Sequence, residues 1–267
     1  MNKKIGFIGV GNMGTAIISG MLDSKFAEPE YVYICDNNKD KCDFFLKKGV
    51  NVCDSITSLA ECSDIVVLAV KPQNYAEVLT ELSAINCESK IFVSIAAGIS
   101  IGYVQKMLKE DAKVVRVMPN TPLLLSKGAT ALCPSDNMTE DEFKIVNDMF
   151  SISSVTEVFD ESHMNEIISV NGSSPAYVYL FAKAMADYAS ECNIDADKAM
   201  NLICATFEGA AAMMRESGDD IETLIRKVSS PGGTTIAALN SFEENNFVDT
   251  VKKAMKACTD RAEELGK

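Results

Sequence analysis

The sequence predicts an α/β protein in which a doubly wound parallel sheet is followed by an all-α C-terminal part. Short β-branched runs alternate with helical patterns up to residue 159, as expected of strands that are covered by helices on both faces. A glycine-rich turn joins the first strand to the first helix. From Ser162 onward strands vanish, and apolar residues recur at helical spacing. We therefore expect one domain at residues 1–161 and a second, helical domain at residues 162–267.

The first strand ends in the turn Gly9-Val10-Gly11-Asn12-Met13-Gly14, and a helical pattern begins at Thr15. This order of strand, glycine turn and helix is the dinucleotide-binding fingerprint of Rossmann-type folds. Gly9 allows the tight turn, Gly11 lets backbone N–H groups reach a pyrophosphate, and Gly14 lets the helix lie close to the strand. The helix N-terminus adds partial positive charge. The alternative interpretation is a glycine turn in some other α/β protein.

The second predicted strand, residues 31–35, ends at Asp36. The fingerprint expects an acidic residue about 20 residues after the glycines, where its carboxylate accepts a hydrogen bond from the ribose 2′-OH. Such a carboxylate repels a 2′-phosphate and favours NAD. The residues that follow, Asn37, Asn38, Lys39 and Lys41, leave NADP open. The sequence thus predicts NADPH or NADH as the cofactor, with NADH favoured by Asp36.

The other elements follow in the order that a doubly wound sheet requires. Strands are expected at 51–53, 64–70, 90–95 and 113–118, and helices at 40–48, 56–62 and 74–83, with another ending at 108. Strands at 129–133 and 155–159, on either side of a helix at 139–150, extend the sheet edge. The C-terminal part contains helical patterns at 178–192, 195–216, 221–228, 235–244 and 248–265.

The C-terminal helices carry apolar seams on more than one face. A half of only about 100 residues has difficulty covering such seams in a monomer. We therefore expect a homo-oligomer that assembles through the helical domain. The alternative is that the seams form a single intramolecular bundle.

Ligands of open α/β sheets bind at the carboxyl ends of the strands. The turns there contain Ala69-Val70-Lys71-Pro72, Ala97 and Asn120, and we assign them to the cofactor site. A small residue such as Ala97 allows a flat nicotinamide ring to lie against the backbone. Lys71 either approaches the phosphates or the ribose, or is an exposed lysine after a buried strand.

A second candidate site is Ser229-Ser230-Pro231-Gly232-Gly233-Thr234-Thr235, directly before a predicted helix. Glycines and hydroxyl residues at a helix N-terminus form an anion site from backbone N–H groups, and a small carboxylate would fit it. The alternative is an elaborate helix cap. The segment Asn171-Gly172-Ser173-Ser174-Pro175-Ala176-Tyr177 is a third candidate, either a capped helix start or a wall facing the substrate.

Composition excludes several classes of function. A net charge of −13 makes nucleic acid or an anionic membrane surface an improbable partner, and no apolar run approaches the length of a membrane span. Nine cysteines without any CxxC spacing indicate neither a disulfide framework nor a zinc site, and they suggest a cytoplasmic protein. His163 is the only histidine, so a Ser-His-Asp triad or a His-based metal site lacks material.

Hydride addition to a carbonyl usually needs an acid, whereas an iminium already carries its charge. A dinucleotide fold, a carboxylate loop and no obvious general acid together indicate reduction of a C=N bond in a small carboxylate. The motifs Gly9–Gly14, Ala69–Pro72, Ala96-Ala97-Gly98, Met118-Pro119-Asn120-Thr121-Pro122, Gly172–Tyr177 and Ser229–Thr235 resemble, in this order, those of pyrroline-5-carboxylate reductases. The resemblance implies reduction of 1-pyrroline-5-carboxylate to L-proline by NAD(P)H, the last step of proline biosynthesis.

Position by position, the resemblance implies that Ser230 and the backbone of Thr234 and Thr235 hold the substrate carboxylate, with Gly233 also in the substrate site. It places the Thr235 hydroxyl at the ring nitrogen. It also implies a dimer interlocked through the helical domain, or a ring of such dimers, with active sites that draw on both chains. Asp54-Ser55-Ile56 departs from many members, which carry an asparagine near this contact to the adenosine half.

Two rival interpretations remain at this stage. A β-hydroxyacid dehydrogenase or general imine reductase shares the two-domain plan. The dehydrogenases need a lysine on the helix entering the second domain, and this chain has none there before Lys183. A non-catalytic dinucleotide sensor would keep the Rossmann half but gives no reason for the loop 230–235.

Overall fold

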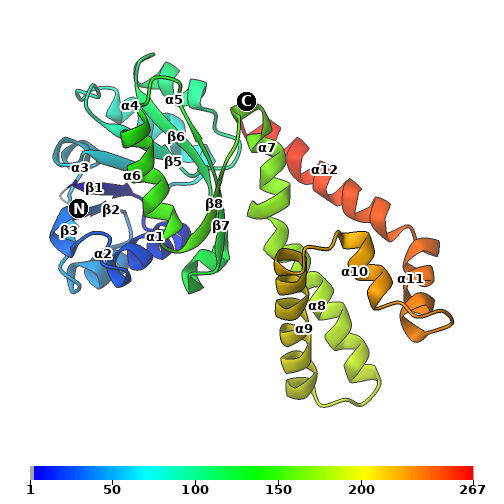
Figure 1. Cartoon of the computed structure of the whole chain (residues 1–267). Helices are drawn as coiled ribbons and strands as arrows, with labels where there is room; N and C mark the ends of the chain where they lie inside the picture. The colour runs from blue at the N-terminus through cyan, green and yellow to red at the C-terminus, as the bar shows by residue number, and fades with distance from the viewer. Residues whose placement is uncertain (1–2, 267) are drawn as a thin grey trace. The chain divides into compact units, whose positions relative to one another are not determined.

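A computed structural model describes residues 3–266, which form two compact units (Figure 1). The sheet unit runs up to Pro175 and includes the segment from Lys256 onward, whereas the helical unit is Ala176–Met255. The division expected at residue 161 stays a prediction. The contacts group residues 162–175 and the last turns of the chain with the sheet unit.

The sheet unit contains an eight-stranded sheet in the order β3-β2-β1-β4-β5-β6-β7-β8. All neighbouring pairs are parallel except β6 and β7. The chain starts at the centre and winds outward in both directions, which confirms the predicted fold class (Figure 1). The strands are β1 (Ile5–Ile8), β2 (Val32–Cys35), β3 (Asn51–Val52), β4 (Ile65–Leu68), β5 (Ile91–Ser94), β6 (Lys113–Met118), β7 (Gly128–Pro134) and β8 (Ser154–Val158).

Helices cover both faces of this sheet, and each face has its own apolar core. Helices α1 (Asn12–Asp23), α2 (Lys39–Leu46) and α6 (Glu140–Ser151) pack on one face. Helices α3 (Ile56–Cys62), α4 (Tyr75–Leu82), α5 (Ile101–Met107) and α7 (Met164–Ile167) pack on the other. Every residue of β4 is buried, because this strand lies between the two layers.

Local sequence explains where several of these helices begin. Ser55 and Thr139 each accept a hydrogen bond from the backbone N–H three residues ahead, in capping boxes with Ser58 and Glu142. Asn38 caps α2 through a single hydrogen bond, which its side chain accepts from the Lys41 N–H. These caps satisfy N–H groups that would otherwise have no partner.

The helical unit is built from long helices, as the apolar stripes predicted. They are α8 (Ser174–Glu191), α9 (Ala196–Glu216), α10 (Ile221–Lys227), α11 (Thr234–Glu244) and α12 (Phe247–Leu265). The first two residues of α8 belong to the sheet unit, and α12 also crosses the division between the units. Asp195 and Asp220 cap α9 and α10. None of the described helices is long and apolar enough to cross a bilayer.

The end of α12 is part of the sheet unit, although its stripe predicted a place in the helical half. Ala262 is 2% exposed and joins the core beside α4 and α5. A side chain at Gly98, whose φ is +82°, would clash with the Ala262 carbonyl oxygen. The Cys258 thiol donates to the Ser173 hydroxyl at 3.3 Å. The sequence pattern located this helix but could not show which core its last turns enter.

Candidate functional site

The glycine turn after β1 requires glycine at two positions because other backbone atoms lie close. Gly9 has a φ of +95°, and a Cβ there would lie 2.8 Å from the Ala69 carbonyl oxygen. A Cβ at Gly14 would lie 2.6 Å from the Gly9 carbonyl oxygen. The Gly9 N–H donates to the Cys35 carbonyl at 2.9 Å, which ties the turn to the end of β2. Gly9 and Gly14 therefore shape the turn itself.

Gly11 differs from these two glycines because nothing lies within 4 Å of the place its Cβ would take. It is also the N-cap of α1, and no side chain caps this helix. The first N–H groups of a helix have no partner within the helix and attract anions. An open approach in front of uncapped N–H groups fits the pyrophosphate of a dinucleotide.

A groove of about 380 Å³ lies at the ends of β1, β2 and β4. It brings together a first group of the cofactor residues predicted from the sequence: Gly9, Gly11, Asp36, Ala69, Val70 and Lys71. These residues meet because the last residues of β1, β2 and β4 are level in the sheet, Ile8 pairing with both Cys35 and Leu68.

The other predicted cofactor residues do not line this groove. Asn12 lines a neighbouring hollow of about 470 Å³ with Lys41 and Phe44, and Met13 packs against the core beside α1. Gly14 is buried, Pro72 opens a 3-10 turn, and Ala97 packs against the other core.

The groove contains Asn37, which the sequence named as a possible neighbour of a 2′-phosphate, and also residues that the sequence prediction missed, among them Asn74, Glu77 and Glu81. Glu77 and Glu81 are spaced by four residues on α4, the helix that follows the Lys71 turn. Their spacing places both on one helix face. In the sequence, these two residues could have been found from their four-residue spacing on a predicted helix that follows the end of a buried strand.

Asp36 is held by two backbone amides. Its Oδ2 accepts a hydrogen bond from the Val10 N–H at 2.5 Å, and its Oδ1 accepts one from the Asn38 N–H at 2.7 Å. The first bond spans from β2 to the glycine turn. The carboxylate is thus fixed at the rim of the groove, and each oxygen keeps further acceptor capacity for a ribose hydroxyl.

Cys35 also lines this groove, beside Asp36. Burial raises the pKa of its thiol to about 11, and neighbouring Cys53 and Cys42 act in the same direction. The thiol therefore stays protonated at neutral pH and offers no nucleophile.

The Asn120 side chain is engaged with the backbone of its own unit. Its Nδ2 donates to the Asn171 carbonyl at 3.1 Å, and its Oδ1 accepts from the Ala129 N–H at 2.9 Å. Asn171 returns the contact, because its Nδ2 donates to the carbonyls of Met118 and Ala129 at 2.9 and 3.1 Å. This Asn120–Asn171 clasp joins the ends of β6 and β7 to a π-helical turn, Ile168–Gly172. The role predicted for Asn120 as a cofactor residue stays a prediction.

The predicted substrate loop lies in the helical unit, between α10 and α11. Gly232 has a φ of +71°, and the Gly233 N–H donates to the Ser230 carbonyl at 2.9 Å. A Cβ at Gly233 would lie 2.6 Å from the Ser230 hydroxyl and 3.0 Å from the Ser230 carbonyl oxygen, so a side chain here would displace the serine. Gly233 is the N-cap of α11 without any side-chain cap, and Thr234 and Thr235 form the first turn. The loop therefore presents a second uncapped helix N-terminus beside hydroxyl groups.

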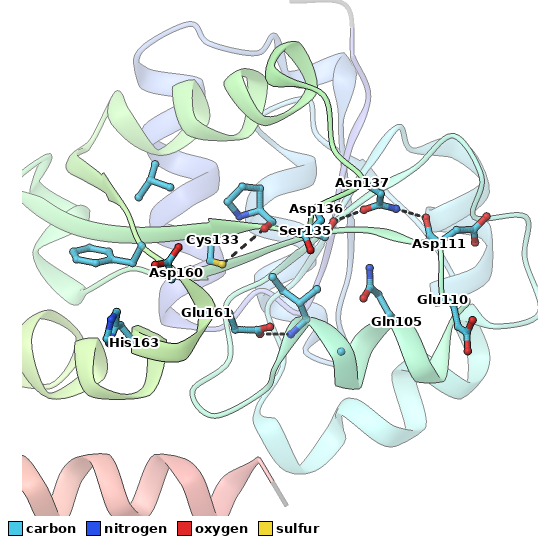
Figure 2. A pocket seen from close by; sticks show the side chains of 15 residues that line it. Gln105, Glu110, Asp111, Cys133, Ser135, Asp136, Asn137, Asp160, Glu161 and His163 are labelled. Atoms are coloured by element: carbon cyan, nitrogen blue, oxygen red, sulfur yellow. Dashed lines mark hydrogen bonds between the residues drawn. The ribbon is translucent and has the colours of Figure 1, made fainter.

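A larger hollow of about 1070 Å³ lies elsewhere on the sheet unit, and no predicted site residue lines it (Figure 2). Its wall includes Glu161, which accepts a hydrogen bond from the Ile101 N–H at 2.6 Å and pairs with the guanidinium of Arg116 at 3.5 Å. Arg116 is 3% exposed, and burial lowers its pKa against the opposing effect of Glu161. His163, which also lines this hollow, is exposed. We interpret this Arg116–Glu161 pair as a structural brace of α5.

Among the described residues, no three His, Cys, Asp or Glu side chains lie close enough together to hold a metal ion. The same part of the chain contains nine free cysteines.

Comparison with known proteins matches both parts of the chain to family models. Residues 161–265 match the model described as pyrroline-5-carboxylate reductase dimerisation. Residues 4–98 match the model described as NADP oxidoreductase coenzyme F420-dependent.

The chain also resembles individual proteins along its whole length. It is 36% identical to the pyrroline-5-carboxylate reductase of Escherichia coli (strain K12), over 100% of both chains. The crystal structure of the Plasmodium falciparum pyrroline carboxylate reductase with NADP bound has a TM-score of 0.93 and 31% identity, and the match covers 100% of this chain and 99% of that one. The reductase structure from Coxiella burnetii has a TM-score of 0.90 and 32% identity, with full coverage of both chains.

Proposed function

This chain belongs to the pyrroline-5-carboxylate reductase family, and we propose that it reduces the C=N bond of 1-pyrroline-5-carboxylate to give L-proline. NADPH or NADH supplies the hydride when it is bound. The reaction is the last step of proline biosynthesis. The observation that carries the proposal is the pair of uncapped helix N-termini, α1 after the glycine turn and α11 after the Ser-Pro-Gly-Gly loop. One suits a pyrophosphate and the other a small carboxylate.

The sheet unit would hold the cofactor through the groove around Gly9 and Gly11. Backbone N–H groups of the first turn of α1 would bind the pyrophosphate, and Gly11 would keep their approach free of side-chain atoms. Asp36 would accept from the ribose of the adenosine half. Lys71, exposed at the end of β4, would balance phosphate charge.

The helical unit would hold the substrate through the loop before α11. The N–H groups of Thr234 and Thr235 would bind the carboxylate, with the Ser230 hydroxyl beside them, while Gly233 keeps the loop closed through its bond to the Ser230 carbonyl. The Thr235 hydroxyl would form a hydrogen bond with the ring nitrogen. These contacts fix the orientation of a planar ring, and orientation supplies much of the rate enhancement in such reactions.

The chemistry needs little acid–base help from the protein. The protonated ring nitrogen makes the substrate an iminium, so hydride adds to the imine carbon while the C=N π electrons move to nitrogen. The proton on nitrogen stays in place, and no alkoxide forms that would need a general acid. This agrees with a site in which Thr235, and no histidine, faces the nitrogen.

The proposal includes assembly through the helical unit as a dimer, or as a ring of such dimers. Four phenylalanines, Phe181, Phe207, Phe242 and Phe247, cluster there with ring centroids 4.9–6.3 Å apart. An apolar hollow of about 840 Å³ lies beside them, and Leu180 on its wall is 70% exposed. Apolar surface of this kind marks an interface, and a second copy is the occupant we propose. A cytoplasmic location remains part of the proposal.

The oligomer is tested by light scattering on a sizing column. Ala211→Glu places a carboxylate in the apolar hollow, and Ala196→Glu makes the same change at the first residue of α9, outside the hollow. We expect the first variant to shift toward monomer and the second to keep the wild-type mass. Equal masses for both variants would argue against this interface.

The activity is tested by the loss of reduced-nicotinamide absorbance with 1-pyrroline-5-carboxylate. Thr235→Ser keeps a hydroxyl, whereas Thr235→Val keeps the shape without it. We expect turnover in the wild type and in Thr235→Ser, and a loss of about tenfold or more in Thr235→Val, as for a lost hydrogen bond to a charged group. Full activity in Thr235→Val would refute the role of the hydroxyl. Absence of turnover with either cofactor would refute the reductase.

A further inference from the structure

We propose that this enzyme prefers NADH to NADPH, and that Asp36 sets the preference while also holding the glycine turn in shape. The inference rests on the proposed use of the groove for a dinucleotide, and it names the cofactor that this groove selects.

The first argument is the position of the Asp36 carboxylate. Two amides, Val10 N–H at 2.5 Å and Asn38 N–H at 2.7 Å, hold its two oxygens at the rim of the groove. A carboxylate held in this way cannot swing aside without losing both bonds. Its free lone pairs can accept from ribose hydroxyls but can only repel the oxygens of a 2′-phosphate.

The second argument is the charge of the groove. Its ionisable carboxylates are Asp36, Glu77 and Glu81, and among the described residues that line it Lys71 is the one basic side chain. A 2′-phosphate would add negative charge where negative charge already prevails. Because the charges lie at a partly buried surface, their interaction is stronger than in bulk water.

The third argument concerns the two lysines that follow Asp36, which the sequence left as possible partners for a 2′-phosphate. Neither Lys39 nor Lys41 lines the groove. Lys41 lines the neighbouring hollow with Asn12 and Asp40, on α1 and α2. Lys39 is exposed as the first residue of α2. Neither lysine therefore adds positive charge to the lining of the groove that contains Asp36.

The bond to Val10 adds a consequence for mutagenesis. Removing the Asp36 side chain takes away the repulsion, but it also leaves the Val10 N–H without its partner and loosens the turn that would hold the pyrophosphate. Asp36→Asn removes the charge and keeps one oxygen, which can still accept from the Val10 N–H although the bond from the Asn38 N–H is lost, whereas Asp36→Ala removes the charge and both acceptors. The two variants therefore separate selection of the cofactor from support of the turn.

The experiment measures the dissociation constants of NADH and NADPH by nucleotide fluorescence, in the whole protein without substrate. We expect the wild type to bind NADH about tenfold more tightly or better, a difference that charge contacts of this kind readily supply. Asp36→Asn should bring the ratio of the two constants close to one. Asp36→Ala should weaken the binding of both nucleotides. Added salt should narrow the wild-type ratio, because salt screens exposed charges.

Asp40→Asn is the matched control, since it removes one carboxylate close in sequence that lines the neighbouring hollow instead of the groove. Its ratio should equal that of the wild type. Equal or tighter NADPH binding by the wild type would overturn the preference, whether or not Asp36→Asn folds. A folded Asp36→Asn with the wild-type ratio would overturn the role of Asp36. Nucleotide binding without turnover would count against the reductase activity and leave this test intact.

Discussion

The open space around Gly11 leads to a prediction that separates binding from folding. In Gly11→Ala the added methyl group meets no heavy atom within 4 Å, and the residue has an extended backbone, with φ −66° and ψ −173°. Alanine adopts this conformation without strain. The gain from a less flexible unfolded chain and the loss of a better N-cap residue are both below about 1 kcal/mol and oppose each other. We expect the free energy of unfolding to change by less than about 0.5 kcal/mol.

The effect on the cofactor should be much larger. The methyl group would occupy the approach to the uncapped N–H groups of α1, so a phosphate could no longer reach them at hydrogen-bond distance. A hydrogen bond to a charged group contributes about 1.5–3 kcal/mol. The loss of one such bond corresponds to binding that is weaker by about 10- to 150-fold.

Two further glycine variants make the comparison sharp. Gly102→Ala, in the first turn of α5, also adds a methyl group with nothing within 4 Å, but outside the groove. It should affect neither stability nor NADH binding by much. Gly14→Ala places its methyl group 2.6 Å from the Gly9 carbonyl oxygen, so it should reduce both. Urea unfolding and fluorescence titration with NADH measure the two quantities.

The results that would refute the reasoning are equally definite. If Gly11→Ala binds NADH as tightly as the wild type, the turn does not hold the pyrophosphate. If it unfolds as easily as Gly14→Ala, the space in front of Gly11 is not free in the protein.

Three predictions concern stability and are all checked by urea unfolding. Asn171→Ala removes the two hydrogen bonds that the clasp makes to the Met118 and Ala129 carbonyls, so it should cost about 2–3 kcal/mol. Asn51→Ala, the matched control, removes two bonds of the same kind near the sheet edge and should cost about 1 kcal/mol; equal losses would argue against a special role of the clasp. Gly98→Ala combines a positive φ with a clash against α12 and should cost about 2–4 kcal/mol, so a smaller loss would mean that α12 yields easily. The Glu142 pKa is lowered from 4.5, mainly by its hydrogen bond to Lys113. This pair stabilises the protein above pH 4.5 and loses its effect as the pH falls further, so Glu142→Gln should flatten the acid decline by about 0.5–1 kcal/mol; an unchanged decline would contradict this assignment.

The grouping of residues at the carboxyl ends of the strands could be predicted from the sequence. Gly9, Gly11, Asp36 and Lys71 were predicted near one another, because parallel strands that end together bring their turns to one edge. The periodicity of apolar residues was sufficient for this prediction, since it marks where each strand stops.

Contacts between residues that are far apart in the sequence could not be predicted from its periodic patterns. Nothing in the vicinity of Asn120 indicates that its amide meets the Asn171 backbone, 51 residues later. The hydrogen bond from the Val10 N–H to Asp36 could not be predicted either, since the fingerprint expects the acidic residue only as an acceptor for the ribose. Such contacts depend on the registry between elements, which single-sequence patterns do not contain. The placement of Thr235 as a substrate contact rests on family resemblance and stays a prediction.

The crossing of α12 between the two units has a consequence for how the protein is made. Residues up to Pro175 leave the ribosome well before Lys256, although both segments belong to the sheet unit. The turns of α12 around Ala262 complete a core whose other buried residues all lie at or before Ile168 in the sequence. The first unit to be synthesised is therefore the last to be finished, because domains formed during synthesis cannot close around a segment that is not yet translated. The core of the sheet unit would therefore stay incomplete while the helical unit is being synthesised. A premature stop codon within the last turns of α12 would damage the nucleotide-binding fold, although that fold lies mostly in the first part of the chain.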